Sequence, residues 1–453
     1  MTLQNKNREM KKYIIAIFCL AIVSATFSQK SDAEFQKIVK EYTLNEDGSV
    51  DYHYTKTLKL LSHFAFHRLY GETFIVHNTD FQNLEINSSY TIMADGKKIV
   101  TPSNAFNEVL PRFANNSPAY NHIREIVVTH TGLEVGSTIN LDYTIKSEPG
   151  FYPYLMGDEI LEESSPVKEL IIRVSIPADK SLNYSLLNIS SEPVISNKGG
   201  QKVFTWTFKS LAASSKDSYQ ESHHTSSPRL VFSSSDFQNA YTDFVSQNAF
   251  KYNTNEGMEK LVSEMQETDM DDLSKCLALQ KTVSNNMGNI SIPLEYAGFK
   301  CRNSIDTWNS NQGTELEKAI LLTSLLQKAG FKTEVVAVMP KLLYNKDIGN
   351  LLAIKDFKVK VQIKKLGDIY LSSNKIDKQN QLFTLGEDAI ISLDKSQSKA
   401  KVIFNKVVEY KIEVEGKFDL QSDKLLGEIE VELENNSNQY FKFYTDSSAM
   451  KTI

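Results

Sequence analysis

Cysteine and histidine are unevenly distributed in this chain, and their positions limit the chemistry that it can perform. All eight histidines lie between His53 and His224, so the stretch from Thr225 to Ile453 contains none. Two of the three cysteines, Cys276 and Cys301, lie within that stretch. A cysteine nucleophile needs a neighbouring base, most often an imidazole, to take its proton. Catalysis by either thiol would therefore need a histidine from the first half of the chain or from a partner.

One segment near these cysteines has the pattern of a well-defined helix. Thr314 and Glu317 match a capping box, in which the two side chains satisfy each other's backbone N–H groups at the start of a helix. Apolar residues follow at helical spacing and predict a core-facing helix over Glu315–Ala329. Gly330 is well placed to end this helix before a predicted strand at Lys332–Met339.

This segment resembles the core of the transglutaminase-like superfamily, which has a papain-type fold. Gly313, Glu317, Lys318 and Ala319 match its motif, Gly-x-Cys-x-Asp/Glu-Lys-Ala. In that superfamily the cysteine lies in the first turn of the helix, where free backbone N–H groups favour the thiolate. A histidine on the next strand pairs with the cysteine, and an aspartate on the following strand orients the histidine.

The resemblance has three departures, and they fall on the three catalytic positions. Glu315 occupies the cysteine position, Phe357 the histidine position to within a residue or two, and Ser372 the aspartate position. We interpret Glu315 as a helix-start residue, because acidic side chains favour the positive end of a helix dipole. The resemblance thus implies a retained fold that has lost its catalytic triad, and we predict no catalytic residue, cofactor or metal.

The elements that must position these residues change in kind along the chain. Alternating runs over residues 30–211 predict an antiparallel β-sandwich-like domain, and serine-rich residues 212–235 predict a linker. Helical periods and then strands over residues 236–395 predict an α+β domain. Residues 403–453 are expected to form an incomplete β region, which makes the fold class multidomain β and α+β. Further helices are expected at Phe237–Phe250, Asn255–Met265 and Asp271–Met287, and further strands at Ser137–Lys146, Lys168–Pro177, Val203–Phe208, Phe357–Lys364 and Asp368–Leu371.

The first half of the chain carries a second resemblance. Segments such as Tyr42–Val50, Tyr70–Phe74, Ala105–Phe113 and Thr129–Gly136 are similar to the uncharacterised β-domain that precedes transglutaminase-like domains in exported proteins of Gram-negative bacteria. That resemblance implies a longer C-terminal β region, of which Val407–Ile453 would be a fragment.

The N-terminus has the features of an export signal. Basic residues precede an apolar run, Tyr13–Phe27, that is too short for a comfortable membrane span, so we expect a signal peptide at residues 1–28. We therefore predict an exported protein, periplasmic or associated with the outer surface. Cys19 lies inside the run and not at its end, which disfavours a lipid anchor. Removal of the signal makes the net charge of −6 more negative, so nucleic acid is an improbable partner.

Other groups of residues are weaker candidates for a site. The adjacent His223 and His224 could bind a metal, but without nearby cysteine or paired carboxylates they are more often simply exposed. His63 and His67 are spaced by four, yet their surroundings predict β structure. Cys276 and Cys301 could form a disulfide, with two buried thiols as the alternative that we favour. A run of alternating aromatics could face a ligand but is more simply strand core: Tyr52, Tyr54, Phe64, Phe66, Tyr70 and Phe74.

Three hypotheses for function follow from the sequence. The first is an exported pseudoenzyme with a binding or assembly role, whose partner would be an unknown protein, peptide or glycan. The second is an active thiol-dependent amidase or peptidase acting on peptide or cell-wall material, with His223 or His224 reaching Cys301. The third is a glycan- or peptide-binding module built on the first domain. An imidazole within hydrogen-bond reach of the Cys301 sulfur would favour the second over the first.

Overall fold

The computed structural model describes residues 31–214, 223–374, 376, 386–405, 411–421 and 424–433. The expected signal peptide with Cys19 lies outside these residues. Within the described part of the chain, no helix is long and apolar enough to cross a membrane.

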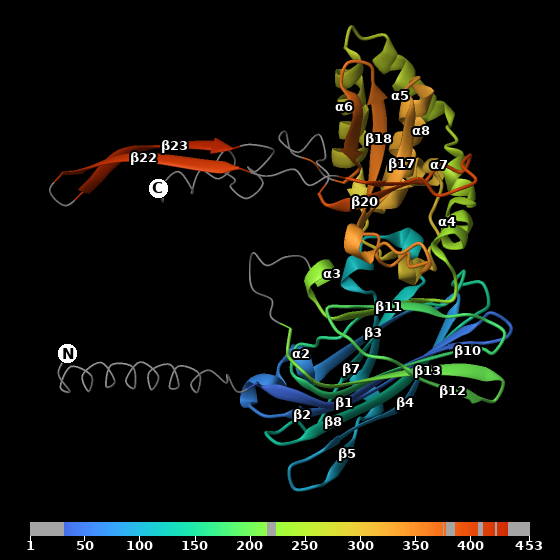
Figure 1. Ribbon diagram of the computed structural model, residues 1–453, viewed down its shortest axis with the longest axis vertical. Coiled ribbons are helices and arrows are strands. Elements are labelled where there is room, and N and C mark those ends of the chain that lie inside the picture. Colours follow the sequence, from blue (N-terminus) through green and yellow to red (C-terminus); the bar gives the residue numbers. More distant parts are fainter. Residues whose placement is uncertain are drawn as a thin grey trace, which may run out of the picture.

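Strands dominate the first half of the chain, and they form one large sheet with two small sheets packed on it (Figure 1). The large sheet has the order β12 (Val194–Lys198), β13 (Gln201–Leu211), β10 (Val167–Pro177), β1 (Ala33–Leu44), β2 (Val50–Leu60), β8 (Thr138–Ser147), β4 (Gln82–Ile92) and β5 (Lys98–Val100). The small sheets are β11 (Asn183–Leu187), β14 (Arg229–Ser233) and β9 (Met156–Ile160), and β3 (Glu72–Asn78), β7 (Ile123–Thr129) and β6 (Phe106–Val109). Apolar residues of both small sheets share hydrophobic clusters with the large one, which gives a layered, sandwich-like core.

The sequence analysis predicts an antiparallel arrangement, but the large sheet contains one parallel pair of strands. Strands β1 and β10 run parallel, with Val39 opposite Ile171 and Tyr42 opposite Val174. Parallel neighbours need a long connection, and here the chain from β2 to β9 supplies it. Alternation of apolar and polar residues predicts which face of a strand is buried, but not the direction of its neighbour.

The serine-rich stretch is only partly a linker. All five residues of β14, Arg229–Ser233, are buried, and the strand pairs with both β9 and β11. The prediction of a linker was wrong here, because the short apolar run Leu230–Phe232 outweighs the polar composition around it. Residues 215–222 lie outside the described part of the chain.

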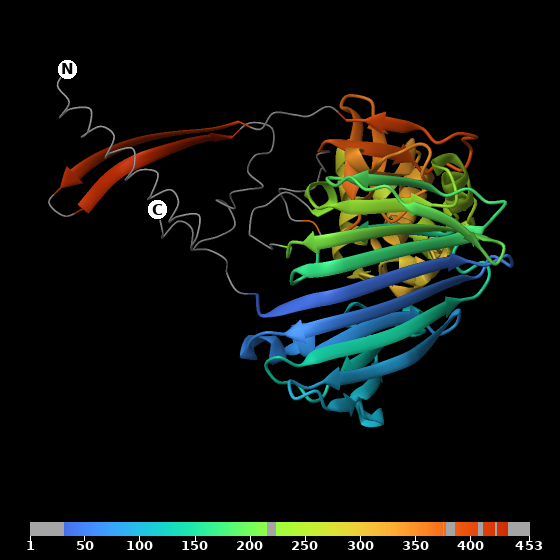
Figure 2. The same ribbon diagram turned by 60° about the horizontal axis from the view of Figure 1, so that its bottom comes forward.

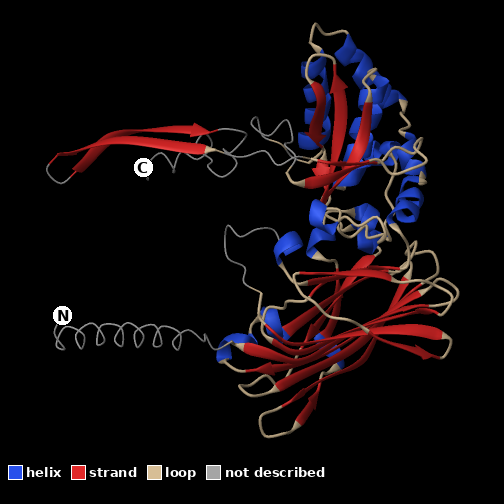
Figure 3. Cartoon of the chain, viewed as in Figure 1, coloured by secondary structure: helices blue, strands red, loops and turns tan. Residues whose placement is uncertain are grey.

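The second half confirms the expected α+β architecture (Figure 3). Its helices are α4 (Phe237–Val245), α5 (Glu256–Gln266), α6 (Asp272–Asn285), α7 (Ser304–Ser310) and α8 (Glu315–Lys328). Its antiparallel sheet has the order β19 (Gly367–Ser372), β18 (Asp356–Ile363), β17 (Thr333–Pro340), β20 (Asp388–Ser392) and β21 (Val402–Phe404). Helix α8 is buried along its length and packs on β17 and β18, as the apolar spacing predicts.

Some elements differ from the sequence expectation. The helix expected over Phe237–Phe250 ends at Val245, and α7 was not expected. Short helices stand where β structure was expected around His63 and His67. The remaining short elements are η1 (His63–Phe66), α2 (Arg68–Gly71), η2 (Ser103–Ala105), η3 (Arg112–Ala114), η4 (Pro118–Tyr120), α3 (His223–Ser226), η5 (Asn248–Lys251), β15 (Gly288–Asn289), η6 (Leu294–Ala297), β16 (Gln312–Gly313), η7 (Lys341–Leu343) and the hairpin β22 (Ile412–Gln421) with β23 (Lys424–Leu433).

The β-rich and α+β halves pack directly on each other (Figure 2). The Phe113 ring stacks on Tyr296 at 5.6 Å between centroids, and the Asn78 amide donates to the Tyr296 carbonyl at 2.9 Å. Gly298 has a positive φ and no room for a side chain, because an added Cβ would lie 2.6 Å from the Phe151 carbonyl oxygen. These contacts place the loop around η6 at the centre of the junction.

Candidate functional site

The start of α8 is fixed by the capping box that the sequence predicts. The Thr314 hydroxyl accepts from the Glu317 N–H at 3.3 Å, and the Glu317 carboxylate accepts from the Thr314 N–H at 2.9 Å. Glu315 is therefore the first residue of the helix, at the positive end of its dipole. This is the position at which the superfamily resemblance expects the nucleophile.

Glu315 is held by an ion pair with Lys358 of the adjacent strand. The Lys358 ammonium lies 2.6 Å from the Glu315 carboxylate and 3.2 Å from that of Asp356. The side chain of Lys358 is 3% exposed and that of Glu315 is 18% exposed. Burial raises the pKa of Glu315, and the Lys358 charge opposes that shift. The pair thus joins the N-terminus of α8 to the middle of the domain's sheet.

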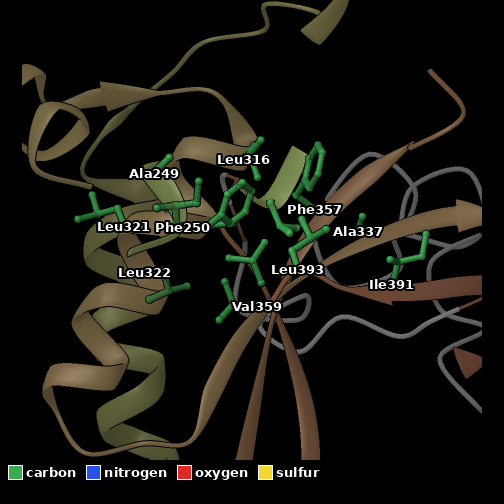
Figure 4. Close-up of a cluster of buried hydrophobic side chains, with 14 of the residues drawn as sticks. Ala249, Phe250, Leu316, Leu321, Leu322, Ala337, Phe357, Val359, Ile391 and Leu393 are labelled. Atoms are coloured by element: carbon green, nitrogen blue, oxygen red, sulfur yellow. The ribbon is translucent and has the colours of Figure 1, made fainter. Parts of the chain in front are cut away.

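Phe357, where the sequence alignment placed the histidine position to within a residue or two, lines the same cleft as Glu315 but does not pair with it. Its side chain is 6% exposed and belongs to the hydrophobic core around Ala337 and Leu393 (Figure 4). Successive side chains of a strand point to opposite faces, so its neighbour Lys358 is the residue that reaches Glu315. Lys358, one residue beyond Phe357 and within the uncertainty of the alignment, is the residue that pairs with Glu315.

Ser372 lies where the third member of the triad is expected. On the paired strands β18 and β19, it stands directly opposite Lys358. The next residue, Ser373, donates from its hydroxyl to the Glu315 backbone carbonyl at 2.8 Å. The fold thus brings Glu315, Lys358 and Ser372 together, and none of the three supplies a thiol or an imidazole.

A cleft of about 530 Å³ opens beside Glu315. Thr314, Leu352, Lys355 and Asn374 contribute to its walls together with residues of the loop around η6. Phe357 borders the cleft but does not fill it. The site therefore keeps a space of the size that small ligands occupy.

Glu317 has a different role from Glu315, two residues before it. Its fully buried carboxylate accepts from the Arg302 guanidinium at 2.8 Å and from the Tyr120 hydroxyl at 2.5 Å. Burial alone raises the pKa of Glu317, but hydrogen bonds and charge from Arg302 hold that pKa below its ordinary value. Because Tyr120 belongs to the β-rich half, this cluster ties the two halves together at the start of α8.

Lys318 is the second buried lysine of the site. Its ammonium donates to the backbone carbonyls of Ser284 and Met287 at 3.3 and 3.4 Å and to the Asn289 side chain. Burial lowers the pKa of Lys318 to about 8. These contacts fasten α8 to α6 and β15, which is a structural role.

Neither cysteine has the surroundings of a nucleophile. Both thiols are free, so the possible disulfide is not formed. Burial raises the pKa of Cys301 well above its ordinary range, and the contact made by its sulfur is with the Gln247 side chain at 3.8 Å. Burial raises the pKa of Cys276 to about 12. Low thiolate content makes both poor nucleophiles.

The other sequence candidates are scattered. No group of three or more potential metal ligands occurs among the described residues, and the side chains of His223 and His224 lie outside them. His67 accepts a hydrogen bond from the Leu69 N–H as the N-cap of α2. The residues of the aromatic run have different surroundings. Phe64 is 75% exposed and Tyr70 is buried in the core, whereas Tyr52 and Phe74 line a cavity between the two halves.

The chain was compared with families and proteins of known structure. The family model described as "Domain of Unknown Function with solved-structure structure (DUF3857)" matches residues 46–215. The search of curated proteins gives no match.

One solved structure is similar over most of the chain. It is a "putative protease" from Parabacteroides distasonis ATCC 8503, with 35% identity and a TM-score of 0.74, covering 83% of this chain and 72% of that protein. A "putative cysteine protease" from Cytophaga hutchinsonii has 12% identity and a TM-score of 0.23, with 85% and 89% covered. An M1 zinc metallopeptidase from Deinococcus radiodurans has 13% identity and a TM-score of 0.23, with 45% and 43% covered.

Proposed function

This chain belongs to the same family as the Parabacteroides distasonis protein, and from that premise we propose that it is a transglutaminase-like pseudoenzyme with a binding or assembly role. Its N-terminal sequence supports export, to the periplasm or the outer surface. The ligand or partner in this role is a protein, peptide or glycan. The cleft beside Glu315 is a place at which part of such a partner could lie.

The observation that carries the proposal is the ion pair between Glu315 and Lys358. Thiol-dependent hydrolysis needs a nucleophile and a base that exchange a proton. An ion pair of a carboxylate with an ammonium group contains neither the thiol that would attack an amide nor the imidazole that would take the proton of that thiol. The two positions that would carry the reaction are here occupied by groups that stabilise each other.

An active amidase or peptidase is the second candidate, and the description of the Parabacteroides distasonis relative as a "putative protease" favours it. It would have to use Cys301, whose buried sulfur contacts the Gln247 side chain and, among the described side chains, no histidine. High thiol pKa and the missing base both oppose this candidate.

The test is an activity assay on the purified protein with labelled casein and with a glutamine-containing peptide plus a fluorescent amine. We expect no turnover above a buffer blank, and no change on Cys301→Ala. Cys276→Ala is the matched control for loss of a buried thiol. Turnover that disappears in Cys301→Ala but persists in Cys276→Ala contradicts the proposal and establishes the second candidate.

A further inference from the structure

A second cavity, of about 380 Å³, lies between the β-rich half and the α+β half. One side is formed by strands β1, β2, β3, β4, β8 and β9 with the residues just before β9, and the other by Glu295, Tyr296, Phe299 and Leu352. Glu295, Phe299 and Leu352 also line the cleft beside Glu315, so they form the wall between the two spaces. The cavity has the volume of a small-molecule site.

The lining of this cavity has an unusual composition. It contains three carboxylates and no lysine, arginine or histidine. It also contains eight aromatic side chains: Tyr42, Tyr52, Phe74, Tyr143, Tyr152, Tyr154, Tyr296 and Phe299. Aromatic faces and carboxylates both attract positive charge, so the lining as a whole favours a cation.

Two of the three carboxylates already form ion pairs with basic side chains that do not line the cavity. Asp158 pairs with Arg229 at 2.8 Å, and Glu159 pairs with Lys40 at 2.7 Å. Glu295 differs from both, since no positive group of the described chain contributes to its pKa, which burial raises. A carboxylate without a counter-ion in a buried wall is costly, and a bound cation would remove that cost.

Tyr154 is a second lining residue with a polar group that has no partner in the described part of the chain. It lines the cavity and is 8% exposed, and its hydroxyl has no hydrogen-bond partner among the described residues. Buried hydroxyls are normally paired, with protein or with a bound molecule. The cavity thus presents an unpaired acid and an unpaired hydroxyl within an aromatic surround.

We propose that this cavity binds a small organic cation, consisting of an ammonium group on an aromatic or aliphatic body. Glu295 neutralises the ammonium group, the ring faces of Tyr152, Tyr296 and Phe299 contact its charge and its carbon body, and Tyr154 adds a hydrogen bond. The site lies apart from the ion pair at Glu315, so it does not depend on whether the cleft is catalytic.

The test is a calorimetric titration of the whole protein at pH 7 with phenethylammonium, 2-phenylethanol and phenylacetate, which share a similar body and differ in charge. We expect saturable binding of the cation, weaker binding of the alcohol and none of the anion. Glu295→Gln keeps the shape of the side chain and should weaken cation binding by about tenfold or more, as expected for removal of one partner of a buried charge pair. Glu256→Gln, on an exposed position of α5, is the matched control and should bind like the wild type.

Tyr154→Phe provides a second variant, which removes one hydroxyl and keeps the ring. It should weaken cation binding by a smaller factor than Glu295→Gln and leave the circular dichroism spectrum unchanged. Equal affinity for the cation and the alcohol, unchanged affinity in Glu295→Gln, or no saturable binding of the cation would each overturn the proposal. None of these results bears on the casein assay, so the two proposals fail separately.

Discussion

Glu315 of α8 and Glu295 of η6 line the same cleft, and they differ in the charged groups around them. Burial raises the pKa of both carboxyls. Glu315 faces the ammonium of Lys358 at 2.6 Å, whereas Glu295 lines a cavity with aromatic rings and with no lysine, arginine or histidine among the residues of that lining. The free-energy cost of burying the Glu315 carboxylate is therefore offset by Lys358. The cost of burying the Glu295 carboxylate is not offset by a cation among the described residues.

This difference separates structural charges from charges available to a ligand. Around the start of α8, each carboxylate has its own partner, Lys358 for Glu315 and Arg302 for Glu317. Such pairs hold the helix, the strand and the two halves of the chain together. In the interdomain cavity, Glu295 and Tyr154 remain unpaired. The carboxylates in the region with the family's sequence motif are thus paired within the protein, whereas the cavity lining includes an acid without a cationic partner among the described residues.

The paired region should be the more sensitive to loss of a single charge, and Arg302 is the strongest case. Arg302→Met would leave the fully buried Glu317 without its cation, and we expect a loss of about 3–5 kcal/mol in the free energy of unfolding. Urea denaturation at pH 7 measures it. Arg68→Met, whose side chain is 74% exposed and pairs with Glu72, is the control and should cost less than about 1 kcal/mol. Similar losses in both variants would show that the cluster at Glu317 is not what joins the two halves.

Loss of the ion pair between Glu315 and Lys358 is expected to have the second-largest effect on the free energy of unfolding. Lys358→Met leaves a partly exposed carboxylate without its partner, and we expect a loss of about 2 kcal/mol, smaller than that of a fully buried pair. The double variant Glu315→Gln/Lys358→Met should be more stable than the sum of the single losses predicts, by about 1 kcal/mol. Strictly additive losses in urea denaturation would contradict the ion pair as the feature that replaces the catalytic pair.

The helix of the site was predictable from the sequence because its signals are local. Thr314 and Glu317 predict the capping box, and the apolar spacing predicts the buried helix that follows. The neighbouring strand was not predictable at the same precision. A shift of one residue in a strand exchanges its two faces, and that shift is the difference between Phe357 in the core and Lys358 at the site.

Features that depend on distant segments could not be predicted. The parallel pairing of β1 with β10 joins residues more than a hundred positions apart, and alternation within each strand does not encode it. The interdomain cavity takes its residues from six strands, from the loop around η6 and from other loops. Tyr52 and Phe74 looked like ordinary strand core, because burial against a cavity and burial against a core give the same sequence pattern.

Replacing either glutamate by glutamine gives the smallest effect, but its sign distinguishes the two regions. Glu315→Gln removes one of the two carboxylates that lie beside the ammonium of Lys358, which is 3% exposed, so it should lower stability at pH 7 by about 1 kcal/mol. Glu295→Gln leaves no cation of the described chain without a partner and removes a carboxylate whose charged form is disfavoured by burial. It should therefore raise stability by about 0.5–1 kcal/mol.

The pH dependence of the Glu295→Gln gain follows from the direction of its pKa shift. Because burial raises the pKa of Glu295 above its ordinary 4.5, the wild type is favoured while the carboxyl stays protonated and loses stability as the pH rises through that value. The advantage of Glu295→Gln should therefore be present at pH 7 and shrink toward zero near pH 4.5, as measured by urea denaturation at both values. An advantage that persists at pH 4.5 would come from packing, and a loss of stability at pH 7 would mean that Glu295 has a counter-charge within the protein and no need of a cation.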